Sequence, residues 1–251
     1  LFRSIGLPIV NLIAKAGWQP ATDTAGRVSY GWSLERLWTT VQETATLFTT
    51  EIRWSLVLAV AATLTALASA GLLAAFPGRL ARRTVTAAML ALICTPGPLV
   101  GIVLIWLFNR ESPALLGQLY DRTLLAPVLA QQFRLLPLAW LLVQTILAAT
   151  PQSVWELAGI DGLNRWQKLM MIVGRHNAMR WLAATLALLS FSLGELSCTI
   201  LVLPPGVTTL AMRLFEMLHF GMRHQDSGLC GLLLLVGWTV SWVVWKTLKD
   251  R

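Results

Sequence analysis

The chain has 251 residues, of which 56% are apolar and only 13% are charged, and 20 Lys and Arg residues against 12 Asp and Glu residues give a net charge of +8. This charged fraction is about half that of a soluble domain. Two charge-free stretches, residues 54–78 and 84–109, each exceed the roughly 20 residues that a membrane-spanning helix needs. A soluble globular protein is therefore excluded, and the basic charge indicates membrane topology rather than a nucleic-acid partner.

Charge-free runs bounded by charged clusters predict the membrane-spanning helices. They give a short or truncated first helix near residues 1–16 and five fuller spans near residues 54–76, 85–108, 124–149, 181–203 and 227–245. The predicted fold class is all-α, a polytopic membrane helix bundle of about six transmembrane helices. Because the chain opens with Leu1 rather than Met, we expect a cut or processed chain whose first helix is incomplete.

The placement of the charges predicts the orientation of these spans. The connection at residues 77–83 carries a net charge of +3, and the connection after the fourth span and the tail after Trp245 carry +2 each. The alternate connections, residues 15–53, 110–122 and 213–226, each have a net charge of zero. Positive charge gathers on the cytoplasmic side of membrane proteins, so the tail and the basic loops are predicted to be cytoplasmic.

The long outer segment before the second span contains a helical pattern. Ser33 can cap a helix whose apolar residues recur at spacings of three and four, namely Leu34, Leu37, Trp38, Val41, Ala45 and Phe48. Both an amphipathic helix in the outer membrane interface and an ordinary helix packed on the bundle fit this pattern. The expected organisation is an incomplete first helix plus outer loop over residues 1–53, followed by the transmembrane domain over residues 54–251.

Small residues in the third span indicate a close contact with another helix. Gly97 and Gly101 are four residues apart and follow Pro96. This spacing permits close approach of a neighbouring backbone, and the proline favours a kink. The pair therefore permits a kink in the third span, although such pairs are common in membrane helices.

Two ionisable residues, Arg134 and Glu195, interrupt otherwise apolar spans. They are expected roughly 15 Å and 13 Å below the outer ends of their helices, and therefore at similar depth. A lone charge at the membrane centre costs about 3 kcal/mol or more, which suggests that the two residues form an ion pair or line a polar path together with Ser197. In the alternative, Arg134 extends outward alone and Glu195 is protonated or satisfied by Ser192 and Ser197.

The loop between the fourth and fifth spans, residues 151–176, has the turn chemistry of two short helices. Pro151 fits the first turn of a helix, and Gly162 permits the left-handed geometry that ends one. Asn164 can cap a second helix. This pattern predicts a helix-turn-helix outside the membrane that is exposed to a partner.

Within this loop the sequence resembles the EAA loop of the inner-membrane permeases of binding-protein-dependent ABC importers. Glu156, Ala158, Gly162 and Ile172 match that pattern, whereas Leu157 replaces its first Ala and Gly174-Arg175 replaces its closing Leu-Pro. The resemblance implies a coupling helix that seats in a groove of a separate cytosolic ATP-binding subunit. The residues expected at that contact are Glu156, Ala158, Gly162, Arg165 and Ile172.

Two further stretches resemble the ferric-iron and related branch of these permeases, which includes thiamine and phosphonate transporters. They are residues 133–139 and a longer stretch that contains Gly194–Ser197, Leu203–Leu210 and Arg213–Gly221. The resemblance covers residues from about 54 to 245 and implies a type I importer permease (MetI-like) architecture with ferric iron or a related small solute as substrate. The chain then resembles the C-terminal half of a fused permease or a truncated subunit.

After the fifth span, Pro204, Pro205 and Gly206 interrupt the helical pattern. By resemblance, the segment from Pro204 to Gly221 forms part of an outer gate or meets a substrate-binding protein. His219 and His224 have no carboxylate pair beside them, and surface or packing roles are expected for both. No metal site is therefore expected.

Several enzyme classes lack support in the sequence. The nucleotide-binding pattern GxxxxGK[ST] and the catalytic patterns HExxH and GxSxG are not found, so no catalytic residue or cofactor is expected and ATP hydrolysis is expected on another subunit. The expected partners are that ATP-binding subunit, a periplasmic or extracellular substrate-binding protein, a second permease half or subunit, and the lipid bilayer, but no nucleic acid. The expected location is the cell inner membrane with a cytoplasmic C-terminus. The alternatives are an integral membrane enzyme that uses Arg134, Glu195 and His residues, and a secondary transporter.

Overall fold

The structure is a computed structural model, and it describes residues 10, 14, 17–22, 28–75, 78–109, 114–164, 167–168, 174–220 and 224–249. Most of the predicted first helix, residues 1–16, lies outside this range. The described elements are β1 (Trp18–Thr22), β2 (Val28–Trp32), α2 (Leu34–Leu47), α3 (Thr49–Ala75), α4 (Arg79–Cys94), α5 (Gly97–Phe108), α6 (Ala114–Arg122), α7 (Leu125–Ala148), α8 (Gln152–Ile160), α10 (Gly174–His176), α11 (Ala178–Leu193), α12 (Leu210–Phe220) and α13 (His224–Lys249).

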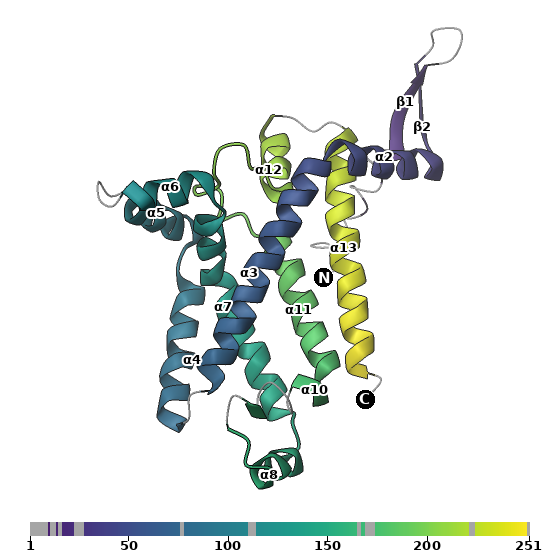
Figure 1. The fold of residues 1–251 in the computed structure, drawn as a ribbon. Helices are drawn as coiled ribbons and strands as arrows, with labels where there is room; N and C mark the ends of the chain where they lie inside the picture. The colour runs from purple at the N-terminus through teal and green to yellow at the C-terminus, as the bar shows by residue number, and fades with distance from the viewer. Residues whose placement is uncertain are drawn as a thin grey trace. The chain divides into compact units, whose positions relative to one another are not determined.

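The helical prediction is confirmed, and within the described ranges three helices are long and apolar enough to cross a membrane: Thr49–Ala75, Leu125–Ala148 and Gly228–Lys246. They match three of the predicted spans. The predicted span at residues 85–108 is wrong as a single helix, because α4 and α5 meet at an angle of 99°. In the ribbon diagram, α5 runs at a steep angle to α4 (Figure 1). The predicted span at 181–203 is too long, since α11 ends at Leu193.

The N-terminal segment contains a β-hairpin that the helical reading did not predict. β1 pairs antiparallel with β2, with Trp18 opposite Trp32 and Thr22 opposite Val28. The expected helix after Ser33 is present as α2. Its buried positions include Thr40 and Thr44, whereas the apolar Leu34 and Trp38 are exposed.

The chain divides into two compact units whose boundaries fall inside α3 and α13. The first comprises Leu1–Ser55 and Val207–Thr239, and the second comprises Leu56–Gly206 and Val240–Arg251. In the first unit, Phe48, Leu210 and Leu229 form a small apolar core. Helix α12 therefore shares a core with the start of α3 and with α13.

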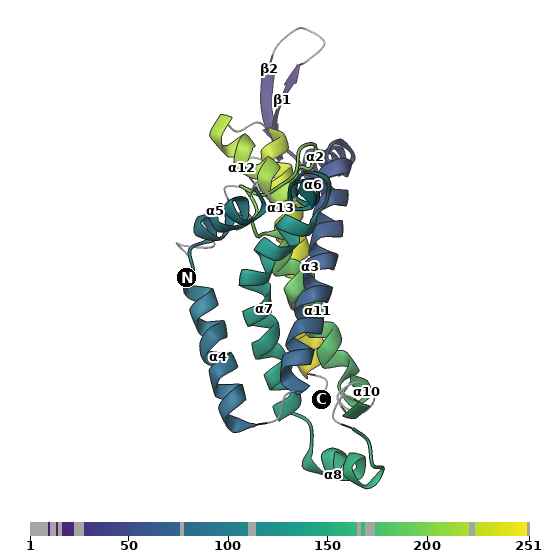
Figure 2. The same ribbon diagram turned by 60° about the vertical axis from the view of Figure 1, so that its left-hand side comes forward.

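Helix α7 is at the centre of the second unit, where it contacts α4, α5, α6 and α11. The main core joins three alanines of α3 with residues of α7 and α11, namely Ala62, Ala66, Ala70, Leu135, Ala139, Val143 and Leu188. Alanines four residues apart leave a smooth helix face, which allows two membrane helices to approach closely. In the rotated view, α7 runs beside α11 and the second-unit part of α3, with α8 beyond its C-terminal end (Figure 2).

Candidate functional site: a polar junction and an exposed loop helix

The break between α4 and α5 has a clear local cause. Pro96 has no backbone N–H and disfavours a helical conformation at the residue before it. Thr95 accordingly adopts an extended conformation with φ −71° and ψ 127°. The break leaves carbonyl groups at the end of α4 that no helical N–H can reach.

Arg134 satisfies one of these carbonyl groups. Its Nη1 donates a hydrogen bond of 2.7 Å from the middle of α7 to the carbonyl oxygen of Ile93. The C-terminal end of a helix carries partial negative charge, so a guanidinium there is favourable. An unsatisfied carbonyl in a membrane is costly, and Arg134 therefore stabilises the broken span.

Glu195 satisfies a backbone N–H group in the turns after α11. Its Oε1 accepts hydrogen bonds from Ser197 Oγ at 2.6 Å and from the backbone N–H of Cys198 at 3.0 Å. These bonds resemble those of a helix cap, in which a side-chain oxygen satisfies a free backbone donor. The carboxylate thereby holds the turns that follow α11.

The two broken segments pack directly against each other. A Cβ placed on Gly97 would lie 2.4 Å from Ser197 Oγ and 2.8 Å from the Ser197 carbonyl carbon, and one on Gly101 would lie 3.0 Å from Leu201 Cβ. The predictions of a kink and of close approach at Gly97 and Gly101 are therefore confirmed. The close partner is the irregular segment after α11 rather than a regular helix.

The structure does not form the ion pair suggested from the sequence. Among the residues that the structure describes, no ion pair within 4.0 Å joins Arg134 and Glu195. Each charge is instead satisfied by backbone or hydroxyl groups at a broken helix end. The alternative that Ser197 satisfies Glu195 agrees with this geometry.

Two glutamines beside Arg134 extend these contacts. Gln131 and Ser192 bond reciprocally, since Ser192 Oγ donates to Gln131 Oε1 and Gln131 Nε2 donates to the Ser192 carbonyl oxygen. Gln132 Nε2 donates to the Ala62 carbonyl oxygen at 3.1 Å and to Thr65 Oγ1 at 2.9 Å. One turn of α7 therefore binds α11, α3 and, through Arg134, α4.

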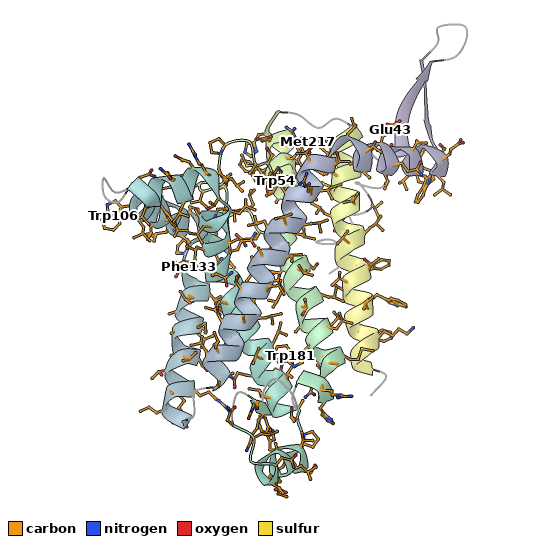
Figure 3. All side chains as sticks on the ribbon, viewed as in Figure 1. Glu43, Trp54, Trp106, Phe133, Trp181 and Met217 are labelled. Carbon is orange, nitrogen blue, oxygen red and sulfur yellow. The ribbon has the colours of Figure 1, made fainter. Side chains whose placement is uncertain are left out.

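We call the set formed by Gln131, Gln132, Arg134, Ser192, Glu195 and Ser197 the polar junction. The sequence analysis named four of its members, Arg134, Ser192, Glu195 and Ser197, and the two glutamines were missed as site residues because they carry no charge. The signal that could have revealed them is an uncharged polar pair placed one helical turn from a charge within an apolar span. Phe133, labelled in Figure 3, lies on the same turn of α7 and packs against the core around α5.

The loop after α7 has the predicted turn geometry. α8 begins directly after Pro151 and is followed by Gly162 at a φ of +64°, a conformation that favours glycine. Asn164 Oδ1 accepts a hydrogen bond of 2.8 Å from the Gln167 backbone, and Gln167 Oε1 accepts one from the Asn164 backbone. This reciprocal cap confirms the predicted capping role of Asn164. Arg165 and Ile172 lie outside the described residues.

Helix α8 exposes apolar side chains on one side and is anchored on the other. Leu157 is 62% exposed and Ile160 is 81% exposed, and Glu156 is also exposed. Ala158 is fully buried, and Trp155 packs against the cluster of Ile146 and Ala184, which includes Trp181 (Figure 3). Leu157 and Ile160 are therefore a candidate contact surface on this helix.

A buried hydrogen-bond network joins the two ends of this loop. Asn177, which is fully buried, donates from Nδ2 to Thr150 Oγ1 at 2.9 Å. Arg180 Nη1 donates to Asn177 Oδ1 and to the carbonyl oxygen of Ala149. We call Thr150, Asn177 and Arg180 the stem clamp, because they tie the end of α7 to the start of α11. The sequence reading missed it, since its two uncharged members are 27 residues apart.

In the first compact unit, an ion pair stabilises α12. Arg213 donates from Nη2 to Glu51 Oε1 at 2.9 Å and from Nη1 to Glu216 Oε2 at 3.2 Å. Ser55 Oγ accepts a hydrogen bond of 2.7 Å from the backbone N–H of Leu210. The sequence analysis used Glu51, Arg213 and Glu216 only to sum the net charges of residues 15–53 and 213–226.

The proposed outer-gate residues fall in the connection before α12. Pro204 is buried, Pro205 is exposed, and Gly206 turns the chain at a φ of +82°. His219 is exposed and bonds to the carbonyl oxygen of Phe215. No group of three potential metal ligands occurs among the residues with described positions.

The sequence is similar to those of known transport permeases. A family model described as "Binding-protein-dependent transport system inner membrane component" matches residues 67–244. Proteins that carry the provisional name 2-aminoethylphosphonate transport system permease protein PhnV, from Salmonella paratyphi A, Salmonella typhi and Salmonella typhimurium, are each 32% identical over 95 residues. That match covers 38% of this chain and 36% of each relative, so the chain covers little more than a third of the length of these proteins.

Proposed function

We propose a function from one premise: the chain belongs to the family of binding-protein-dependent transport system inner membrane components. It is therefore a transport permease of the inner membrane with several apolar helices. Our proposal is that it forms part of the translocation path of an ATP-driven ABC importer. The proposed partners are a cytosolic ATP-binding subunit, a substrate-binding protein on the outer side and a second permease half or subunit, with the C-terminus in the cytoplasm.

The exposed face of α8 carries this proposal. Leu157 and Ile160 present apolar surface outside the membrane-spanning helices, and Glu156 adds a charged group beside them. Apolar anchors with a polar rim are typical of a protein contact. Burial of Ala158 and packing of Trp155 fix the helix to the ends of α7 and α11. This arrangement supports α8 as the coupling helix that seats on the ATP-binding subunit.

The stem clamp supplies a physical route from α8 to the membrane. Through Asn177 and Thr150, a displacement of the loop acts on α7 and α11 together. The same two helices meet again at Gln131 and Ser192 in the polar junction. A rigid-body movement at the loop therefore reaches the broken spans through helices that are bonded at both places.

For the substrate, the relatives favour one member of the predicted group. The sequence resemblance left ferric iron, thiamine and phosphonates open, and the PhnV proteins are named for 2-aminoethylphosphonate transport. We propose a small phosphonate as the transported solute. ATP-dependent uptake of labelled 2-aminoethylphosphonate, ferric iron and thiamine by cells with the complete transporter tests this choice, and uptake of iron or thiamine alone would overturn it.

The coupling proposal is tested by charge substitution on α8. Leu157→Glu combined with Ile160→Glu is expected to abolish co-purification of the ATP-binding subunit and ATP-dependent uptake. Gln152→Glu, at an exposed position of the same helix, is the matched control and should change neither. A secondary transporter, one of the two alternatives, would keep ion-driven uptake in the double variant and without the ATP-binding subunit.

A further inference from the structure

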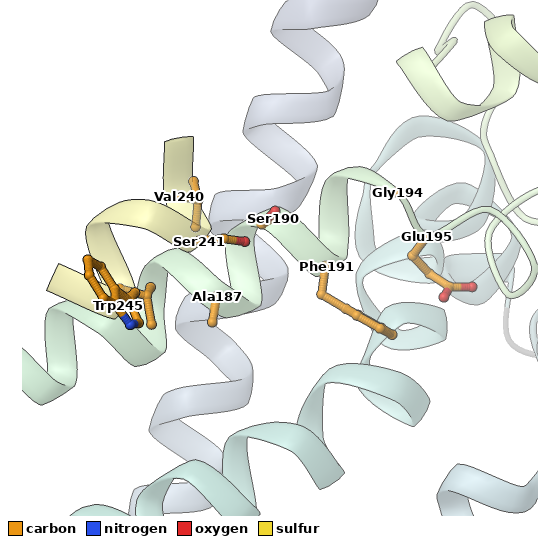
Figure 4. Close-up of a pocket in the computed structure, with 9 residues that line it drawn as sticks. Ala187, Ser190, Phe191, Gly194, Glu195, Val240, Ser241 and Trp245 are labelled. Atoms are coloured by element: carbon orange, nitrogen blue, oxygen red, sulfur yellow. The ribbon is translucent and has the colours of Figure 1, made fainter. Parts of the chain in front are cut away.

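A groove of about 890 Å³ lies between α11 and the last turns of α13, both within the second compact unit. Its lining includes Ser190 and Phe191 on α11, Glu195 beyond the end of that helix, and Ser241 and Trp245 on α13 (Figure 4). The volume is within the range of small-molecule sites. The groove can therefore admit a small solute.

The chemistry of the groove is that of a cation site. Of its described lining residues, Glu195 alone is charged, with two serine hydroxyls and apolar or aromatic side chains making up much of the remainder. Among the described residues, Ser197 and Cys198 both donate to Oε1 of Glu195. Its other oxygen, Oε2, can therefore accept a hydrogen bond from a bound solute. A carboxylate among apolar groups attracts a cation more strongly than it does in water.

The backbone around Glu195 is irregular. The chain leaves the helix after Leu193 and continues through turns to Val202. Irregular backbone at membrane depth occurs where it is buried in protein or lines a water-filled cavity. Glu195, near the start of this irregular segment, is one of the residues that line the groove.

We propose that this groove binds the primary ammonium group of the transported solute, with Glu195 as the carboxylate that receives it. The inference rests on the proposed transport function and deepens it, because it assigns a charge requirement to the path. Arg134 is not among the lining residues, and its guanidinium is bonded to the carbonyl of Ile93. The groove therefore selects for the cationic end of a solute.

Thiol labelling of the complete transporter tests the field of the groove without any assumption about substrate. In a background with Cys94→Ser, Cys198→Ala and Cys230→Ala, Ser190→Cys is labelled with a trimethylammonium-ethyl and a sulfonatoethyl methanethiosulfonate. The measured quantity is the ratio of the cationic rate to the anionic rate. Glu195→Gln keeps an oxygen for Ser197 and Cys198, and it should lower this ratio about tenfold, the size expected for one nearby charge.

A cysteine at Gln152, which is exposed on α8, is the matched control, and its ratio should not respond to Glu195→Gln. An unchanged ratio at Ser190→Cys, or a preference for the anionic reagent, would overturn the proposal. So would a thiol that neither reagent reaches, because the groove would then be closed. These outcomes hold whichever solute is transported.

Uptake then separates this inference from the proposed function. With 2-aminoethylphosphonate and ethylphosphonate as probes, the complete wild-type transporter should prefer the amino compound, and Glu195→Gln should remove that preference. If neither phosphonate is taken up, the proposed substrate class fails while the labelling ratio still decides the charge of the groove. If phosphonates are taken up and the preference persists in Glu195→Gln, the ammonium site is wrong and the transport function stands.

Discussion

The contact between the two broken spans makes a quantitative prediction for Gly97→Ala. The added carbon would lie 2.4 Å from Ser197 Oγ, 2.7 Å from its Cβ and 2.8 Å from its carbonyl carbon. Because one of these atoms is backbone, a change of side-chain rotamer cannot relieve the contact. The segment after α11 must retreat by roughly 0.6 Å or more in a closely packed interior.

Overpacking of this kind costs about 1–3 kcal/mol in the free energy of unfolding. For a chain of this size we expect the midpoint of thermal unfolding to fall by about 2–4 °C per kcal/mol. Since the displaced segment carries Glu195, substrate uptake should fall as well. Thermal unfolding of the purified transporter in detergent and uptake in cells measure the two effects.

Two glycines provide the comparison series. At Gly101 the new carbon would lie 3.0 Å from the Leu201 side chain, so Gly101→Ala should cost less than Gly97→Ala. At Gly117, on α6, nothing lies within 4 Å, and alanine there should be neutral or stabilising by up to about 1 kcal/mol. Equal stabilities for Gly97→Ala and Gly117→Ala would refute the close contact.

Three further substitutions test the other contacts. Arg134→Met leaves a helix-end carbonyl unsatisfied and should lower the free energy of unfolding by about 1–3 kcal/mol, which thermal unfolding measures. Exchange of the charges at Arg134 and Glu195 should not restore stability, since a rescue would indicate a direct ion pair. Asn177→Ala should uncouple ATP hydrolysis from uptake while the ATP-binding subunit still co-purifies, and coupled uptake at the wild-type level would argue against the stem clamp. Arg213→Met leaves the buried Glu51 unpaired and should destabilise the chain by about 1–2 kcal/mol, between the values for exposed and buried ion pairs, because Arg213 is partly exposed. Denaturant unfolding measures this change, and an unchanged transition would mean that the pair is not stabilising.

The membrane helices were largely predictable, because a charge-free apolar run is itself the physical requirement for a span. Their breaks were less so. Pro96 was interpreted as a kink, but the sequence alone did not give the size of the bend, 99°, or the contacts of Gly97 and Arg134 beside it. The end of α11 was missed because the residues that follow it are also mostly apolar. Side-chain bonds from Glu195 to the local backbone compete there with the helix.

At the site, the sequence identified the charges and one partner, Ser197 for Glu195. The hypothesis that Arg134 and Glu195 form an ion pair left out the free backbone groups of broken helices, which also satisfy the two side chains. The loop at residues 151–176 was interpreted better, since Gly162 and Asn164 act through local geometry that a short sequence specifies. The stem clamp and the Glu51–Arg213 pair depend on residues far apart in the chain.

The proposed coupling of α8 to an ATP-binding subunit is tested most directly by photocrosslinking at Ile160. This residue is 81% exposed, so replacement by p-benzoylphenylalanine should preserve the fold and uptake. We predict a crosslink to the ATP-binding subunit in the complete transporter, with a yield that changes between the ATP-bound and nucleotide-free states. Full ATP-dependent uptake without such a crosslink would contradict the assignment of α8 as the coupling helix.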